Sequence, residues 1–245
     1  MPGLEQRTIG NLNCLVYTTS NSPDLVAVIS HGFGAPGDDL VPLGAHLLRF
    51  APELLDRVLM VFPAAPLNLS EHGIPGGRAW WMLDMEELQQ AISHGEFRDL
   101  RQSQPPGLID SRNQLVETIE AIREETSLPW DRVALLGFSQ GGMLSTEVAF
   151  SLEESPAGLV VWSGTLINEA EWLKSAPRRE HMPMLQSHGQ RDMVLPFQAA
   201  QWLRSLAISA GINHQWLPFN GGHEVPYPVL QETARFLVDL LNRDG

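Results

Sequence analysis

The sequence predicts an α/β protein with a mostly parallel central sheet and helices on both faces. Short apolar runs without polar alternation recur along the chain, as expected of strands that are buried on both faces. Turn residues and then helical patterns follow most of these runs, and this alternation predicts right-handed crossover connections. The chain has 245 residues, which suits one medium domain with a large core.

Five apolar runs and two further segments are the expected strands. The runs are rich in Val, Leu and Ile and span residues 25–30, 58–62, 133–136, 159–162 and 184–187. Residues 214–219 form another candidate, with Trp216 and Phe219 as its bulk. Residues 12–19 alternate more clearly between apolar and polar side chains, so we expect an early antiparallel edge strand there.

The segments between these strands have helical spacing. Asp38 and Asp39 are placed to cap a helix over the leucines that follow. Residues 109–125 carry an apolar stripe that ends before Pro129. The remaining helical patterns span residues 141–152, 197–210 and 228–242.

Residues 67–107 do not fit this alternation. The segment is rich in Gly, Gln, Ser and Pro and includes Trp80 and Trp81. A connection this long inside a compact domain is usually functional or locally folded. We therefore expect a single domain over residues 1–245, with a long connector or partial lid at about 67–107.

Composition excludes several functional classes. The chain has 16 Lys+Arg against 29 Asp+Glu, a net charge of −13, which argues against nucleic acid and anionic lipid as partners. No run approaches the roughly 18 apolar residues of a membrane span, so we expect no membrane insertion. The N-terminus has no basic and apolar leader, and we expect a cytoplasmic protein. The lone Cys14 excludes an internal disulfide and multi-cysteine metal sites.

A nucleophile motif lies between a predicted strand and a predicted helix. Residues 137–141 read Gly-Phe-Ser-Gln-Gly and fit G-x-S-x-G in the strand-turn-helix context that this motif requires. Ser139 would then occupy a strained turn, where larger neighbours two residues away would clash. The following helix N-terminus offers N–H groups to a developing oxyanion. The alternative is a chance glycine-serine turn.

Two later loops carry a suitable acid and base. A serine nucleophile needs a base and an orienting carboxylate, which follow it in the order acid, then His. Asp192 and His223 each follow a predicted strand, so both fall at the carboxyl edge of the sheet. We therefore predict a triad of Ser139, Asp192 and His223.

Other acids and bases in the chain compete for these roles. Glu224 adjoins His223 in sequence, which is a poor position for a directed side-chain hydrogen bond. His188 precedes a glycine at a strand end, and His214 opens a strand; we favour structural roles for both. Glu169 is a further competing acid.

The turn after the first buried strand is the expected second part of an oxyanion hole. Residues 30–34 read Ser-His-Gly-Phe-Gly, a glycine-rich turn that can aim a backbone N–H at a carbonyl oxygen. We assign one donor to the amide of Phe33 and the other to the amide of Gln140. A tight turn without chemistry is the alternative, and we expect His31 to have a packing or hydrogen-bonding role.

Five blocks of this sequence resemble the phospholipase/carboxylesterase family of α/β-hydrolases, which includes acyl-protein thioesterases. The likeness runs from about Leu25 to Leu241. The blocks are His-Gly-Phe-Gly-Ala at 31–35 with Asp39, Phe-Pro-Ala-Ala-Pro at 62–66, Gly-Gly-Arg-Ala-Trp at 76–80, Gly-Phe-Ser-Gln-Gly-Gly at 137–142, and His-Gly at 188–189 with Asp192, Val194, Pro196 and Gly-His-Glu at 222–224. The glutamine and second glycine of the fourth block are more specific than G-x-S-x-G alone.

The resemblance implies a serine hydrolase of carboxylic esters or thioesters that works through an acyl-enzyme with the same triad. It implies no metal or organic cofactor, a small acyl substrate and a weak homodimer. The chain departs from the family pattern after Trp80, because Trp81, Met82 and Leu83 precede Asp84. This departure bears on substrate range rather than on chemistry.

Substrate contacts are expected near the two tryptophans. Trp80, Trp81 and Met82, with Leu83 and Met85, are candidates for an acyl-binding wall. For any one of them, packing of the connector on the core is the competing and favoured interpretation.

Three functional hypotheses remain open. The first is the esterase or thioesterase, and the second is a small-ligand binding protein of this fold with little catalysis. The third keeps the fold and changes the reaction to that of a peptidase, lactonase or perhydrolase. The eight histidines show no His-Glu-x-x-His spacing, and no phosphate-binding loop motif occurs, which disfavours a metal hydrolase and a phosphate-binding enzyme.

Overall fold

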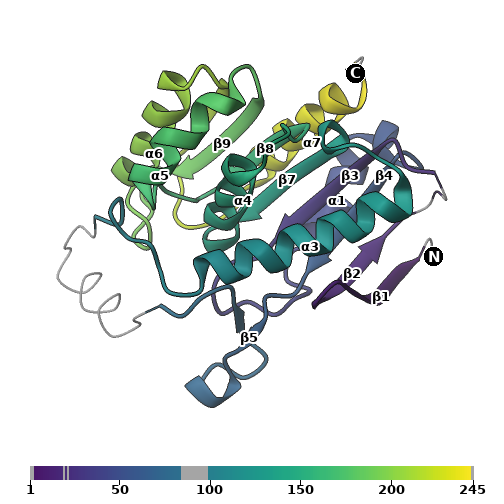
Figure 1. Ribbon diagram of the computed structural model, residues 1–245, viewed down its shortest axis with the longest axis horizontal. Coiled ribbons are helices and arrows are strands. Elements are labelled where there is room, and N and C mark those ends of the chain that lie inside the picture. Colours follow the sequence, from purple (N-terminus) through teal and green to yellow (C-terminus); the bar gives the residue numbers. More distant parts are fainter. Residues whose placement is uncertain (1–2, 19, 21, 84–98, 244–245) are drawn as a thin grey trace.

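A mixed eight-stranded sheet forms the centre of the molecule in the computed structural model, which describes residues 3–18, 20, 22–83 and 99–243 (Figure 1). The strands are β1 (Leu4–Ile9), β2 (Leu12–Tyr17), β3 (Leu25–Ser30), β4 (Val58–Pro63), β7 (Val133–Phe138), β8 (Gly158–Trp162), β9 (Pro183–Gly189) and β10 (Asn213–Phe219). Their order is β1-β2-β4-β3-β7-β8-β9-β10. The pairs β1–β2 and β2–β4 are antiparallel and the others are parallel, which confirms the predicted fold class.

Helices cover the two faces of this sheet. They are α1 (Val41–Phe50), α3 (Leu108–Thr126), α4 (Gln140–Ser151), α5 (Glu169–Ser175), α6 (Phe197–Ser209) and α7 (Tyr227–Leu241). Short 3₁₀ helices occupy Pro52–Leu54, Ser70–His72, Trp130–Arg132 and Ala176–Arg179. Buried residues of α3, α4, α5 and α6 share one apolar cluster, and those of α1 and α7 share another.

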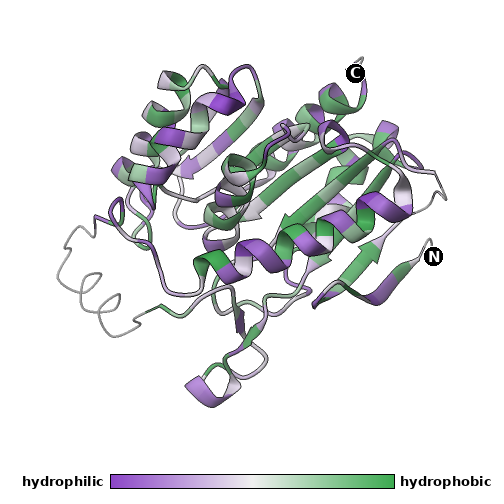
Figure 2. Ribbon diagram, in the orientation of Figure 1, coloured by the Kyte–Doolittle hydropathy of each residue, from purple (hydrophilic) through white to green (hydrophobic). Residues whose placement is uncertain are grey.

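Strand β3 shows why its apolar run does not alternate with polar residues. Leu25, Ala27 and Ile29 pack in the cluster with α1 and α7, whereas Val26 and Val28 pack in the cluster with α3 and α4. Successive side chains point to opposite faces, so a strand covered on both sides is apolar throughout. Figure 2 shows the same contrast, with hydrophobic strands in the sheet beside a helix α3 of mixed character.

The strand order reverses beside β3, and this places the functional residues. From β3 the chain pairs first with β4 on one side and later with β7 on the other. In open α/β sheets, such a switch point leaves a crevice outside the carboxyl ends of the two strands. Strand β3 ends at Ser30 and β7 at Phe138, directly before the glycine-rich turn and Ser139.

Two expectations from the sequence are wrong in detail. The segment predicted at 12–19 is antiparallel, but it is not an edge strand, because β1 pairs along its outer side. Strand β1 was not predicted, because most of it is exposed and polar and it contains no apolar run. Asp38 and Asp39 do not cap α1, whose cap residue is Leu40 with no side-chain cap hydrogen bond. Helix α5 was also not expected.

The segment at 67–107 contains a small hairpin. Strands β5 (Leu67–Asn68) and β6 (Arg78–Ala79) pair antiparallel and form a separate two-stranded sheet. Residues 84–98, with the candidate Met85, lie outside the described residues, and the expected lid stays a prediction. In the part of the chain that the structure describes, no helix combines the length and apolarity needed to cross a membrane.

Candidate active site

Ser139 lies in a sharp turn between β7 and α4. Its φ of 53° and ψ of −117° place a non-glycine residue at positive φ, which is uncommon and marks a strained position. Its backbone N–H donates to the Trp162 carbonyl oxygen at 2.8 Å, which ties the turn to the neighbouring strand β8. The predicted strand-turn-helix context of Ser139 is therefore present.

The two glycines of the motif are required by close backbone contacts. A Cβ on Gly137 would lie 2.2 Å from the Gly141 carbonyl oxygen. A Cβ on Gly141 would lie 2.1 Å from the Ser30 carbonyl oxygen, at the end of β3. Since both contacts are to backbone, neither can be relieved by a rotamer change.

Replacement of Gly141 by alanine is expected to lower the free energy of unfolding by roughly 1–3 kcal/mol or more, because the methyl group must push β3 and α4 apart. Urea denaturation measures this loss. Gly3→Ala is the matched control, since a Cβ there meets only the Glu5 side chain, at 3.6 Å or more. Equal stability of the two variants would contradict the packing of this turn.

Asp192 and His223 lie together on adjacent loops. Nδ1 of His223 is 2.7 Å from Oδ2 of Asp192. Strands β9 and β10 pair in parallel, and the loops beyond them are joined by backbone hydrogen bonds from Gln190 to Phe219 and from Arg191 to Gly221, each 2.9 Å long. The parallel register thus brings together two residues that are 31 positions apart.

The Asp192 carboxylate is buried and fully hydrogen-bonded. Its Oδ1 accepts from the amides of Val194 and Leu195, each at 2.9 Å. Burial by itself raises the pKa of Asp192, but hydrogen bonds from His188, His223 and the Leu195 amide outweigh it and hold the pKa below its usual range. Asp192 is therefore an anion at neutral pH and fixes the Nδ1–H tautomer of His223.

His188 supports Asp192 from the interior. Its Nε2 lies 2.6 Å from the Leu195 carbonyl oxygen and 3.3 Å from Oδ2 of Asp192. Both neighbours are acceptors, so Nε2 carries the proton and donates to them. The expected structural role of His188 is thus present, and it shares one carboxylate oxygen with His223.

The other competing groups lie elsewhere. Nε2 of His214 is 2.9 Å from the Gln186 side chain, and burial lowers the pKa of His214 to about 4. Glu169 begins helix α5 and accepts from Gln102. The Glu224 carboxylate accepts from the Gly222 amide rather than contacting His223.

Loops after β3 and β7 approach each other at Ser139. A Cβ on Gly32 would lie 3.4 Å from Cβ of Ser139, so the turn carrying Phe33 passes close to the nucleophile. The Gln140 amide belongs to the first turn of α4, where N–H groups have no partner within the helix. Both expected oxyanion donors therefore come from segments next to Ser139.

His31 holds this turn from beneath. Its Nε2 accepts from the Ala65 amide at 3.0 Å, and its Nδ1 lies 2.8 Å from the Gly32 carbonyl oxygen. Burial lowers the pKa of His31, so the ring is neutral and can accept that amide. The expected hydrogen-bonding role of His31 is present.

The side chain of Gln140 has a role that sequence reasoning missed. Its Oε1 accepts from the Trp80 amide and its Nε2 donates to the Trp81 carbonyl oxygen, both at 2.9 Å. The glutamine thereby ties the two tryptophans to the nucleophile turn. The only signal in the sequence was that a glutamine directly after the serine is more specific to the resembled family than G-x-S-x-G alone.

A mainly apolar cavity of about 270 Å³ opens at Ser139, and we call it the nucleophile cavity. Its lining residues are Trp81, Met82, Leu83, Leu100, Ser103, Pro105, Pro106, Ser139, Gln140, Met143, Ile167, Val194 and Leu195. Trp81 and Met82 thus line the cavity next to Ser139, as the predicted substrate contacts require. Trp80 does not line the cavity, because its ring is buried and its indole N–H donates to the His31 carbonyl oxygen at 2.9 Å.

His223 packs beside the residue that precedes Ser139. Its ring and that of Phe138, the residue before Ser139, have centroids 4.8 Å apart. The imidazole is partly exposed, whereas Asp192 is buried behind it.

A larger cavity of about 410 Å³ beside β2 and α1 is lined by glycine, alanine, larger apolar residues and Tyr17, and holds no candidate nucleophile.

In the described residues, no group of three or more His, Cys, Asp or Glu side chains is placed to hold a metal ion. The groups present at this edge of the sheet are a serine in a strained turn, an imidazole with a buried carboxylate behind it, and a second turn close to the serine. Together they suit nucleophilic attack on an acyl carbonyl.

Comparisons with known proteins show what the chain as a whole is similar to. The family model described as Phospholipase/Carboxylesterase matches residues 13–241. Acyl-protein thioesterase 1 of Eremothecium gossypii is 27% identical over 216 residues, covering 86% of this chain and 85% of the relative. The crystal structure of esterase PE8 superimposes with a TM-score of 0.77 at 24% identity, covering 94% of this chain and 99% of that one. The Bacillus cereus carboxylesterase structure gives a TM-score of 0.66 at 15% identity, with 94% of each chain covered.

Proposed function

Because the chain belongs to the phospholipase/carboxylesterase family and is a hydrolase of carboxylic esters or thioesters, we propose that Ser139, His223 and Asp192 carry out this hydrolysis. The observation that carries the proposal is the 2.7 Å contact between Asp192 and His223, on loops beside the strained Ser139 turn. A buried anion behind a partly exposed imidazole is the arrangement that activates a serine.

The proposed reaction has two acyl-transfer steps. In the first, Nε2 of His223 takes the Ser139 hydroxyl proton as Oγ attacks the acyl carbonyl carbon. The tetrahedral intermediate collapses when the same proton passes to the leaving alcohol or thiol, which leaves an acyl-Ser139 ester. Water, deprotonated by His223, then attacks this ester and releases the carboxylic acid and Ser139.

Charge develops on the carbonyl oxygen in both steps. We assign its stabilisation to the amides of Phe33 and Gln140, and one such donor is typically worth about 2.7–4 kcal/mol. Positive charge develops on His223 at the same moment, and Asp192 stabilises it, since hydrogen bonds keep the pKa of that carboxyl low.

The nucleophile cavity supports an apolar acyl group as the part of the substrate that is recognised. Its walls are mainly Trp81, Met82, Leu83 and other apolar side chains, and none of the described residues that line it is charged. We propose a small ester or thioester with an apolar acyl chain. A cytoplasmic location and a weak homodimer stay predictions.

Covalent labelling by a fluorophosphonate tests the proposed nucleophile. We expect one mole of label per mole of folded protein, on Ser139, because the oxyanion donors stabilise attack by this one hydroxyl. Peptide mass spectrometry locates the label, and heat-unfolded protein is the control that should remain unlabelled. A label on another serine, or none, would overturn the assignment.

A panel of acetyl to octanoyl p-nitrophenyl esters, the matching thioesters, lysophospholipids and aminoacyl amides separates the reactions open to this site. The proposal requires turnover of the esters or thioesters at higher kcat/KM than of the amides. Tight binding of a small ligand without turnover of any of them would favour the binding-protein alternative.

A further inference from the structure

The nucleophile cavity shares a wall with a second cavity. Ser103, Pro105 and Ile167 line the nucleophile cavity. Gln104 and Asn168, their neighbours in sequence, line a polar cavity of about 330 Å³. Because adjacent residues face different cavities, the wall between the two is only one chain thick at these places.

One side of this wall is residues 99–107, which we call the strap. Hydrogen bonds from the start of α5 hold it, since the amide of Asn168 donates to the Ser103 carbonyl oxygen and that of Glu169 to Arg101, both at 2.9 Å. The Gln102 side chain adds a bond to the Glu169 carboxylate at 3.0 Å. At its other end the strap continues directly into α3.

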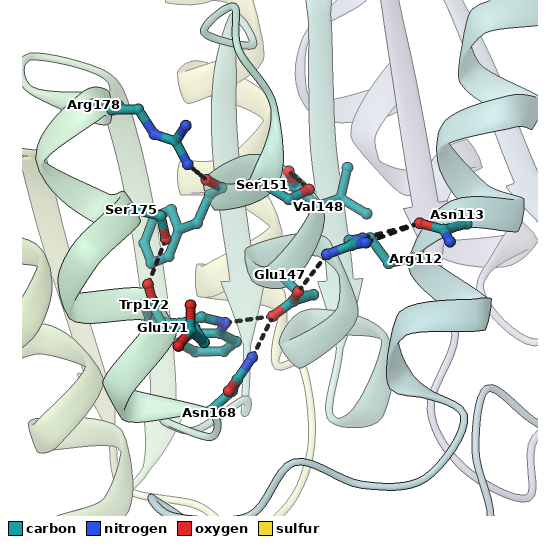
Figure 3. Close-up of polar contacts among 11 residues, drawn as sticks. Arg112, Asn113, Glu147, Val148, Ser151, Asn168, Glu171, Trp172, Ser175 and Arg178 are labelled. Carbon is teal, nitrogen blue, oxygen red and sulfur yellow. Dashed lines mark hydrogen bonds and ion pairs between the residues drawn. The ribbon is translucent and has the colours of Figure 1, made fainter.

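A single buried carboxylate connects the two helices that flank the strap. Glu147 projects from α4, the helix that begins at the nucleophile, and only 6% of its side chain is exposed. Its Oε2 accepts from the Trp172 indole N–H at 2.6 Å and from the side-chain amide of Asn168 at 3.2 Å, both from the α5 side. Its Oε1 lies 3.2 Å from the Arg112 guanidinium, in the first turns of α3. Figure 3 shows Glu147 between these partners.

The three contacts use both oxygens and therefore need a carboxylate. A buried ion pair contributes little net stability compared with apolar packing of the same volume, but removal of one partner leaves an unpaired charge. A glutamine offers one oxygen and one NH₂ group, so it cannot accept from α5 and from Arg112 together.

We propose that Glu147 is a specificity-determining positioning residue, which sets the preference of the enzyme among acyl chains by fixing both ends of the strap. This inference rests on the proposed function, because it takes the nucleophile cavity as the acyl site. Glu147 does not line that cavity; it acts through Asn168 and Arg112.

The strap contacts long acyl chains and not short ones. Leu100 and Pro106 of the strap line the same cavity as Ser139. On this proposal an acetyl group bound to Ser139 is too short to reach them, whereas an octanoyl chain packs against them. Each methylene that packs on a fixed wall contributes about a fourfold factor in kcat/KM. A loosened strap therefore lowers kcat/KM for octanoyl esters and does not change kcat/KM for acetyl esters.

Two variants break the connection in different ways. Glu147→Gln removes the charge that holds Arg112 and α5 together. Asn168→Gly removes the hydrogen bond from the Asn168 side chain to Glu147 and keeps the backbone bond to Ser103. Glycine also suits the φ of 48° at this position. If Glu147→Gln fails to fold, Asn168→Gly carries the test alone.

The measured quantity is the ratio of kcat/KM for p-nitrophenyl octanoate to that for p-nitrophenyl acetate, together with Tm. We expect both variants to lower the ratio on the order of tenfold, with kcat/KM for acetate within about twofold of wild type. Ser175→Ala is the control, since this hydroxyl lines the polar cavity and bonds to the Glu171 carbonyl oxygen, without a contact to Glu147. Its ratio should equal that of wild type.

An unchanged ratio despite a lower Tm would overturn the inference, since Glu147 would then contribute stability only. An equal loss on both esters would also overturn it, because the damage would then lie at Ser139. Wild-type protein that turns over neither ester would contradict the proposed function, and the inference with it.

Discussion

Ser139→Ala is expected to lower kcat for p-nitrophenyl acetate by about a millionfold, while KM stays within a few-fold of wild type. In the proposed mechanism this hydroxyl forms the acyl-enzyme, whereas the apolar cavity and the two assigned backbone donors remain in the variant. The residual rate comes from those donors and from binding alone, which typically leave about 10³–10⁴-fold catalysis over water.

The structure supplies a matched control for this variant. Ser151 lies at the other end of the same helix α4, where its hydroxyl donates to the Val148 carbonyl oxygen at 2.9 Å. Ser151→Ala should keep wild-type kcat. Steady-state kinetics on both purified variants, with Tm to confirm folding, makes the comparison. Activity of Ser139→Ala above a hundredth of wild type would require a different nucleophile.

Asp192→Asn is expected to lower kcat about 10⁴-fold at neutral pH. The carboxylate now accepts the Nδ1–H of His223 at 2.7 Å, so that Nε2 keeps a lone pair for the serine proton. An asparagine NH₂ at this place would donate to Nδ1 and drive the proton to Nε2, which could then no longer accept one. The volume of the side chain is preserved, so the loss reflects the tautomer rather than packing.

The pH dependence of stability gives an independent check on the same carboxylate. Hydrogen bonds hold the pKa of Asp192 below its unfolded value, so the anion contributes stability above the unfolded pKa of about 3.9, and that stability is lost as pH falls through the folded pKa. The difference in free energy of unfolding between wild type and Asp192→Asn should be full above about pH 5 and shrink in acid. Asp239→Asn, an exposed residue on α7, should show no such pattern. A difference that does not change with pH would contradict the ionised state of Asp192.

Local patterns carried much of the fold and of the site. The apolar runs marked the buried strands, because a strand covered on both faces must be apolar on both. The motif around Ser139 predicted the local geometry, because its glycines are required by close backbone contacts inside the turn and at the end of β3. Asp192 and His223 followed from the rule that parallel strands end at one edge of a sheet.

The parts that the sequence did not predict depend on distant partners. Gln140 binds the backbone of Trp80, 60 positions away, and Glu147 binds Arg112, 35 positions away. Nothing local distinguishes Trp80 from Trp81, yet only the second lines the nucleophile cavity. Which of two adjacent aromatic rings faces a cavity is decided by the loop that carries them, and hydrogen bonds from other elements hold that loop.

The double attachment of Gln140 limits how this scaffold can be redesigned. The side chain holds the loop that carries Trp81, and the backbone N–H of the same residue is the assigned oxyanion donor. A glutamate there would bring an anion beside the negative charge of the intermediate, and an asparagine is one methylene shorter. An engineer who seeks a new substrate can vary the exposed Met82 in size, whereas Trp81 is buried in the core, and both lie on a loop whose anchor residue also carries the proposed oxyanion donor.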